Sequence, residues 1–139
     1  MIVVTWYEQY IGRPWAAAPN PPESFNCGEL LRYIHLKELN IETPSIEIDA
    51  SSLKACVARM RPALFGLRPL AQGQRPSEYD CAFFARARYE DHCGIAVATV
   101  DGLLIMHCLQ GVGVVLESEA ESKKRGFHSI TWCRHTARG

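Results

Sequence analysis

The chain has 139 residues, 47% of them hydrophobic and 22% charged, which is the size and composition of one ordinary globular domain. Fifteen basic residues balance fifteen acidic ones, so no net field favours nucleic acid, and the basic clusters 59–61 and 123–125 are better explained as solvated surface. The six cysteines include no Cys-x-x-Cys pair, which argues against a zinc ribbon, a thioredoxin motif or a disulfide framework and indicates folding in a reducing compartment.

The N-terminal residues show no basic segment, and their apolar run is broken at once. We therefore expect neither a signal peptide nor a membrane span. Residues 3–11 are expected to form a short amphipathic helix, because Gly12 and Pro14 follow as helix-ending residues. Trp15 then lies in a loop, either as a packed aromatic at the edge of the core or as the wall of a pocket.

The next helix is predicted to begin at Cys27 and to end near Asn40. The Pro-rich run 19–24 cannot be helical, and Asn26 is a favoured N-cap residue. An apolar stripe at i, i+3, i+4 and i+7 turns the sulfur toward a core, and it comprises Cys27, Leu30, Leu31 and Ile34. A helix N-terminus favours thiolate over thiol, which can make a cysteine nucleophilic. Cysteine is also a common buried hydrophobe, so this position alone leaves a structural role open.

A second helix is expected after Ser52, which follows a connector containing Ile46 and Ile48. The buried stripe of this helix is expected to comprise Leu53, Cys56, Val57, Met60 and Leu64. Residues 66–80 are rich in Gly, Pro, Gln and Arg, and they predict a surface loop.

Beyond residue 80 the periodicity becomes that of β-strands, and no long helix interrupts it. Candidate strands cover 81–87, 92–100, 102–110, 112–117 and 127–135. The Asp101-Gly102 dipeptide between two apolar runs predicts a hairpin, so an antiparallel meander is expected. Helices followed by strands predict a single α+β domain over residues 1–139, with the N-terminal helices packed on one face of a five- or six-stranded antiparallel sheet.

Two histidines occupy the arms of this predicted hairpin: His92 opens one strand and His107 lies in the next. Either alone is better explained as a structural residue. A nucleophilic cysteine, however, needs a general base within hydrogen-bond reach and benefits from a third polar group that orients the base. Cys27, His92 and His107 together could supply all three groups.

These residues resemble the NlpC/P60 cysteine peptidases, especially the short forms encoded by tailed phages, which share a compact papain-like α+β fold. The motifs that carry the resemblance are Gly12-Arg13-Pro14-Trp15, Phe25-Asn26-Cys27, His92-Cys93-Gly94-Ile95 and Leu104-Ile105-Met106-His107. The resemblance implies Cys27 as nucleophile, His92 as general base and His107 as the orienting residue. It also implies substrate contacts from Asn26 and from Trp15, which stands where the family usually has a pocket tyrosine.

The resemblance further implies a function: hydrolysis of an amide bond in peptidoglycan stem peptides, of the γ-D-glutamyl to diamino acid type. The context would be a phage tail or a prophage-encoded cell-wall hydrolase, made in the bacterial cytoplasm, with the peptidoglycan peptide as substrate and tail-tip proteins as partners. No cofactor, metal, nucleic acid or membrane is expected.

A binding module and a zinc site are alternatives to an active peptidase, and a third alternative, an acyltransferase, is disfavoured. The family's usual Asp-Cys-Ser/Trp-Gly is replaced here by Asn26-Cys27-Gly28-Glu29, which keeps open a papain-like binding or assembly module without turnover. A zinc site built from Cys27, His92 and His107 would suit the ligand types, but its spacing matches no known finger. A lipid-directed acyltransferase is disfavoured, because its histidine precedes its cysteine in the chain.

The predicted hairpin raises a geometric conflict. A strict two-residue turn at Asp101-Gly102 would set His107 opposite Ala96, about 13 Å from His92 at about 3.3 Å per residue. That separation is too long for a hydrogen bond. We therefore expect a wider loop or a bulge near 98–102. Without one, Gln110 becomes the candidate for the third group.

Overall fold

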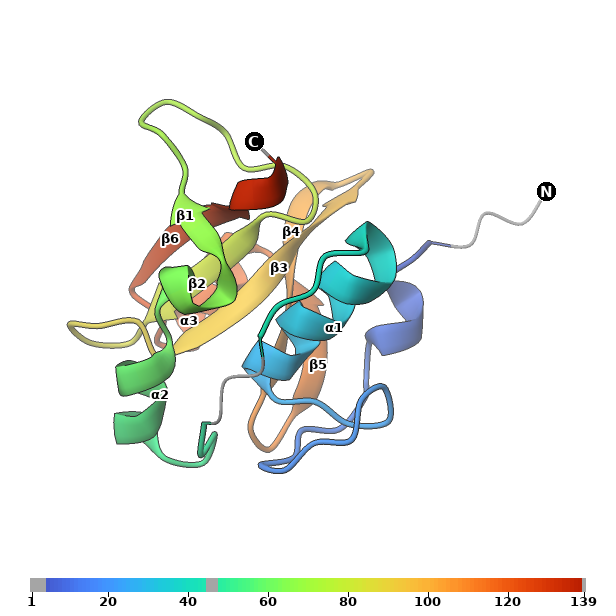
Figure 1. Ribbon diagram of the computed structural model, residues 1–139, viewed down its shortest axis with the longest axis vertical. Helices are drawn as coiled ribbons and strands as arrows, with labels where there is room; N and C mark the ends of the chain where they lie inside the picture. The colour runs from blue at the N-terminus through green and yellow to red at the C-terminus, as the bar shows by residue number, and fades with distance from the viewer. Residues whose placement is uncertain (1–4, 45–47, 139) are drawn as a thin grey trace.

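The computed structural model describes residues 5–44 and 48–138. In these ranges, three α-helices and short 3-10 turns accompany one six-stranded, open antiparallel sheet (Figure 1). The expected α+β class is confirmed. Residues 3 and 4 of the predicted first helix, and Ile46 of the predicted connector, lie outside the described residues.

The sheet contains every strand that the periodicity predicted, each one or two residues shorter. The strands are β1 (Leu67–Pro69), β2 (Cys81–Ala85), β3 (His92–Thr99), β4 (Gly102–Leu109), β5 (Gly113–Glu117) and β6 (Ser129–His135). Their order is β1-β6-β2-β3-β4-β5, so β2 to β5 form the expected meander, whereas β6 returns to the far side of β2.

Two elements depart from the prediction. Strand β1 lies inside the supposed loop 66–80, where three residues pair with β6. Helix α3 (Glu119–Lys124) precedes β6 and begins with a capping box, in which Ser118 and Glu121 satisfy each other's backbone N–H groups. The strand depends on a partner more than 60 positions away, whereas the helix is signalled locally.

Helix α1 (Cys27–Leu39) begins and ends where the sequence predicted. The side-chain oxygen of Asn26 accepts a hydrogen bond from the Glu29 N–H at 2.9 Å, which satisfies one of the free N–H groups of the first turn. At the other end, Asn40 adopts the left-handed conformation with φ 54°. Cys27 is therefore placed by local capping chemistry.

Helix α2 (Leu53–Arg59) is capped by Ser52 as expected, but it is shorter than its predicted stripe. Pro62 disfavours helical backbone at Arg61, which is extended, and a separate 3-10 helix covers Pro62–Phe65. Cys56 and Met60 are buried, whereas Leu53 and Leu64 are exposed. The prediction that Cys56 belongs to the core is confirmed. The prediction that the helix continues to Leu64, with Leu53 and Leu64 on its buried stripe, is wrong.

The helix predicted over 3–11 is wrong for the residues that the structure describes, where only a 3-10 turn forms at Glu8–Tyr10. The chain instead runs along the edge of the sheet. Gly12 donates its N–H to the Val114 carbonyl at 2.9 Å, and Val114 donates to the Arg13 carbonyl at 2.9 Å. These two bonds hold residues 12 and 13 against β5, directly after the 3-10 turn, so the chain follows the sheet edge in place of a longer helix.

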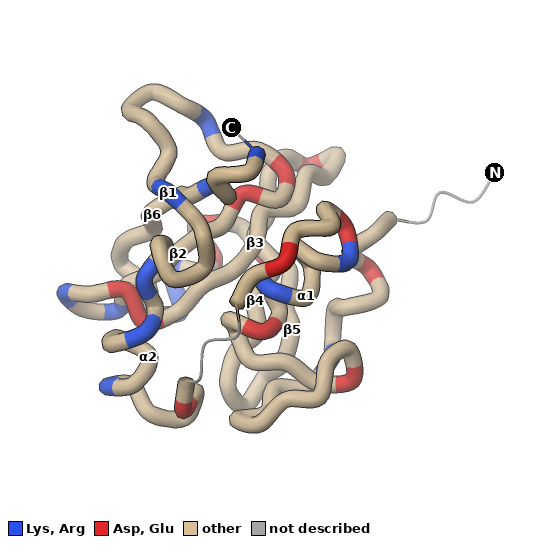
Figure 2. Tube along the Cα trace, viewed as in Figure 1, with Lys and Arg blue, Asp and Glu red and all other residues tan. Residues whose placement is uncertain are grey.

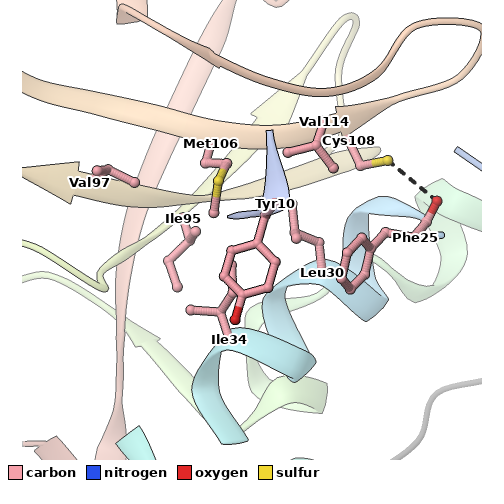
Figure 3. Packing of buried hydrophobic residues seen from close by; sticks show 9 residues of the cluster. All are labelled: Tyr10, Phe25, Leu30, Ile34, Ile95, Val97, Met106, Cys108 and Val114. Carbon is pink, nitrogen blue, oxygen red and sulfur yellow. Dashed lines mark hydrogen bonds between the residues drawn. The ribbon is translucent and has the colours of Figure 1, made fainter. Parts of the chain in front are cut away.

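Helix α1 packs across β3 and β4 on one face of the sheet (Figure 1). The core between them comprises Tyr10, Phe25, Leu30, Ile34, Ile95, Val97, Met106, Cys108 and Val114 (Figure 3). The Cys108 thiol donates a hydrogen bond to the Phe25 carbonyl at 3.3 Å, two residues before α1 begins. This contact ties the start of α1 directly to β4.

Candidate active site

Cys27 is the first residue of α1, and its side chain packs with Cys93 of β3 in a buried cluster on the helix side of the sheet. Only 7% of Cys27 remains exposed. As the first helical residue, it has a backbone N–H with no partner within the helix. The sulfur is therefore held at the positive end of a 13-residue helix.

His92 opens β3 and is held between aromatic rings on the other face of the sheet. Its ring stacks on Phe127, with centroids 4.9 Å apart and planes at 13°, and lies 5.2 Å from the Phe84 ring. His92 is the first residue of β3, and it lines one cavity with Cys27 at the head of α1. The rings restrict its orientation, and 6% of the residue stays exposed.

His107 reaches His92 through a register that the sequence did not predict. Thr99 pairs with Gly102 and the ladder continues without interruption to Ile95 and Met106, so the two-residue turn is Val100-Asp101, and the expected wider loop or bulge is wrong. His107 then lies beside Gly94, where a Cβ atom would come within 2.9 Å of the His107 Cβ.

The two imidazoles are diagonal neighbours across the strands. His92 Nε2 lies 2.8 Å from His107 Nδ1, a direct hydrogen bond. Diagonal positions are about 7–8 Å apart at the backbone, within reach of long side chains. Gln110 is therefore not needed as the partner of His92, although it lines the same cavity.

Glu117, the last residue of β5, is a further member of this group that was not predicted from the sequence. His107 Nε2 lies 2.7 Å from Glu117 Oε1. The Arg125 Nε–H donates to both carboxylate oxygens at 2.8 and 2.9 Å, and the Ser122 hydroxyl donates to Oε1 at 3.3 Å. The available signal was a carboxylate at the end of an otherwise apolar strand, which suggests a paired buried charge.

His107 is neutral in this environment. Burial, with the nearby charges of His92 and Arg125, lowers the pKa of His107 to about 2. A proton taken from a thiol would therefore reside on His92, and His107 acts as a neutral hydrogen-bonding partner.

The environment of Cys27 favours the thiolate. Hydrogen bonding from the Cys93 side chain lowers the pKa of Cys27 most; burial opposes this effect, and the charge and hydrogen bonding of His92 and the Cys93 backbone lower it further. The net result is a pKa well below the ordinary value. The same contact raises the pKa of Cys93 well above its usual range, so Cys27 is the acidic member of the pair.

A cavity of about 130 Å³ joins the sulfur and the imidazole. Its lining residues are Trp15, Cys27, Ala50, Cys56, Arg86, Asp91, His92, Cys108, Leu109, Gln110 and Phe127. They include the head of α1, the start of β3 and the end of β4. Cys27 and His92 thus share one hollow, whose small volume suits a narrow chain or a single side chain.

Arg86 brings a cation to this cavity. Its Nε–H donates to the buried Asp91 at 2.7 Å, and its guanidinium lies over the Phe127 ring, 5.3 Å from the centroid. The side chain is 54% exposed, so it remains accessible from solvent. Figure 2 shows further Lys and Arg residues around α2 and β1.

A larger hollow, of about 740 Å³, lies elsewhere. It runs between α2, β1 and the β2–β3 connection, and its lining includes Lys54, Arg61, Arg68, Tyr89 and Glu90. Neither Cys27 nor His92 lines it. The larger hollow therefore lacks the thiol and the imidazole that the smaller cavity brings together.

The predicted substrate-contact residues have different positions. Trp15 lines the cavity with Cys27, which fits the pocket-wall interpretation. Asn26 uses its side-chain oxygen to cap α1. His35, which the sequence left without a partner, is buried beside Cys81 and His135 rather than near the cavity, with His35 Nε2 3.7 Å from Cys81 Sγ.

Within residues 5–44 and 48–138, no three His, Cys, Asp or Glu side chains are arranged to hold a metal ion. The zinc alternative finds no support there, because His92 and His107 direct ring nitrogens at each other. None of the described helices has the length and apolar character required to cross a bilayer. No family model and no curated protein matches this sequence.

Proposed function

We propose that this chain is a cysteine peptidase with a papain-like fold of the NlpC/P60 type. The observation that carries the proposal is the cavity in which Cys27, at the start of α1, meets His92, itself hydrogen bonded to His107 at 2.8 Å. A thiol, a base and a group that orients the base are the minimum for nucleophilic amide hydrolysis.

The reaction begins when the Cys27 thiolate attacks the carbonyl carbon of the scissile amide. His92 carries the proton removed from the thiol and delivers it to the departing amine, leaving an acyl thioester on Cys27. A water molecule then loses a proton to His92 and attacks the thioester, which releases the carboxylic acid and restores the thiol and the neutral imidazole. The Cys27 N–H, free of intrahelical bonding, can donate to the oxyanion in both steps.

The proposed substrate is a peptidoglycan stem peptide, cut between a γ-D-glutamyl residue and a diamino acid. A γ-linked glutamyl residue keeps a free α-carboxylate close to the scissile bond. The guanidinium of Arg86, a half-exposed side chain that lines the cavity with Cys27, suits such an anion. A phage tail or prophage-encoded hydrolase that contacts tail-tip proteins is the context we propose for this activity.

The test is incubation with defined muropeptides, with products identified by mass spectrometry. We expect the wild-type protein to cleave and Cys27→Ala to be inactive with an unchanged circular dichroism spectrum. Cys56→Ala is the matched control: Cys56 lines the same cavity, but burial raises its pKa to about 11, so it is a poor nucleophile. Cleavage by Cys27→Ala at the wild-type rate would refute the proposal.

One observation favours a second candidate, a binding module that keeps the fold without turnover. Cys27 is only 7% exposed, and the adjoining cavity is small, so a peptide has little access to the sulfur in this conformation. This candidate predicts that the wild-type protein binds muropeptides without forming products, and that iodoacetamide labels Cys27 no faster than the other thiols.

A further inference from the structure

Glu117 is a buried carboxylate whose partners lead directly to the candidate nucleophile. It is 6% exposed and lies between His107, Arg125 and Ser122. A buried charge persists only when it is paired and hydrogen bonded. Arg125 supplies the opposite charge and its Nε–H donates to both carboxylate oxygens, so the carboxylate of Glu117 serves as a hydrogen-bond acceptor.

That restriction determines which nitrogen of His107 carries hydrogen. A carboxylate only accepts, so the His107 nitrogen facing Glu117, Nε2, must be the donor. Neutral imidazole has one N–H, and the low pKa of His107 keeps it neutral. Its Nδ1 is therefore an acceptor.

The next ring is restricted in the same way. Because His107 Nδ1 accepts, His92 Nε2 must donate across the 2.8 Å contact. The remaining nitrogen of His92, Nδ1, is then bare in the neutral ring and free to take a proton from Cys27. The carboxylate thus selects the tautomer that makes His92 a base toward the sulfur.

We propose that Glu117 is a positioning residue for this site, the terminal member of a chain that runs Cys27, His92, His107, Glu117, with Arg125 holding its charge. The proposal rests on the nucleophilic role proposed for Cys27. A carboxylate that only stabilised the fold would have no effect on the His92 tautomer.

Loss of the carboxylate has a specific consequence. With an amide at position 117, His107 is free to carry its hydrogen on Nδ1, where it would oppose the Nε2–H of His92. His92 would then move its hydrogen to Nδ1, the atom that must stay bare to accept a proton. The imidazolium that pairs with the Cys27 thiolate would also lose a stabilising negative charge.

The direct test uses the unmodified protein. Nitrogen-15 chemical shifts of histidine-labelled protein report which ring nitrogen carries hydrogen. We expect the neutral Nε2–H form for His107 and an Nε2-protonated ring for His92. A His107 ring in the Nδ1–H form would overturn the proposal, and this result does not depend on any variant folding.

The second test compares Glu117→Gln with Glu119→Gln, which removes the same charge from an exposed position two residues away. For Glu117→Gln we expect kcat for muropeptides to fall about a hundredfold at unchanged KM, the size of a general-base contribution. The pH at which iodoacetamide alkylation of Cys27 reaches half its maximum should rise by about one unit. Glu119→Gln should alter neither.

The outcomes separate this proposal from the proposed function. Wild-type rates and an unshifted alkylation profile in folded Glu117→Gln would refute the role of Glu117 and leave the peptidase proposal standing. Absence of muropeptide cleavage by the wild-type protein, with the predicted tautomers and the shifted alkylation profile present, would refute the substrate assignment instead.

Discussion

His107 lies beside Gly94, and the absence of a side chain at Gly94 lets the His107 ring approach His92 to 2.8 Å. A Cβ atom on Gly94 would lie 2.9 Å from three atoms: the His107 Cβ, the Ile105 Cγ2 and the Met106 carbonyl oxygen. One of these is backbone, which cannot move aside without disturbing the β3–β4 pairing. The geometry of the histidine pair therefore depends on a glycine.

We expect Gly94→Ala to destabilise the fold by about 1–3 kcal/mol, the usual result of overpacking, and to abolish muropeptide cleavage. Urea unfolding and the cleavage assay measure the two effects. Gly28→Ala is the stability control, because a Cβ there meets the Phe65 ring at an ordinary 3.6 Å. A Gly94→Ala protein with wild-type stability and activity would contradict the close packing described for this position.

Cys93 should control the acidity of Cys27. Since hydrogen bonding from the Cys93 side chain is the largest influence lowering the pKa of Cys27, Cys93→Ala should raise that pKa. A higher pKa leaves less thiolate below neutral pH. At a pH below the pKa, a rise of about one unit in that pKa lowers the thiolate fraction, and so slows alkylation of Cys27, by up to about tenfold. Peptide mapping after iodoacetamide treatment measures the rate.

The control for this experiment is Cys133→Ala. Cys133 is equally buried in the same cluster, so the substitution creates a similar void, but it is not among the groups that influence Cys27. Equal slowing in both variants would mean that packing, not the hydrogen bond, sets the reactivity of Cys27.

Arg86 should recognise an anionic group of the substrate. For Arg86→Gln we expect KM for muropeptides to rise about tenfold, consistent with loss of one partly exposed charge-assisted hydrogen bond, while kcat changes little. Arg88→Gln removes the same charge from an exposed residue that stacks on Tyr89, outside the cavity. If KM rises equally in both variants, the cause is the general loss of positive charge and not a specific contact made by Arg86.

Asp80 should make folding stability depend on pH. Burial alone would raise its pKa, but hydrogen bonds and charge from Arg134, with the Ser77 N–H and the Arg138 charge, lower it below the ordinary value. A depressed folded-state pKa contributes stability above the unfolded pKa of about 4, and this contribution is lost as the pH falls toward the folded value.

Asp80→Asn should therefore cost about 3–5 kcal/mol at pH 7, the range for breaking a buried ion pair. Urea unfolding at pH 7 and at about pH 3 should show this deficit shrinking in acid. Asp101→Asn, in the exposed β3–β4 turn, should leave unfolding unchanged at both values. If Asp80→Asn loses the same free energy of unfolding at both pH values, ionisation of Asp80 is not the cause of the loss.

Local chemistry in the sequence was sufficient to place Cys27. The Pro-rich run, the Asn26 cap and the apolar stripe all act within a few residues, and α1 begins and ends where they predict. The same holds for the Ser52 cap and for the five predicted strands, whose bounds differ by one or two residues. Each of these signals depends on hydrogen bonds or side-chain periods within one segment.

Only the tertiary structure decided how these segments meet. The turn at Val100-Asp101 differs by one position from the predicted turn, and that difference brings His107 next to His92 without a bulge. Glu117 becomes part of the site only because β5 pairs with β4 and Arg125 folds back from α3. Gly12 and Arg13 lie along the sheet edge because β5 offers them hydrogen bonds. Strand register and edge pairing arise from competition between distant backbone groups, so no single segment of the sequence contains the information that sets them.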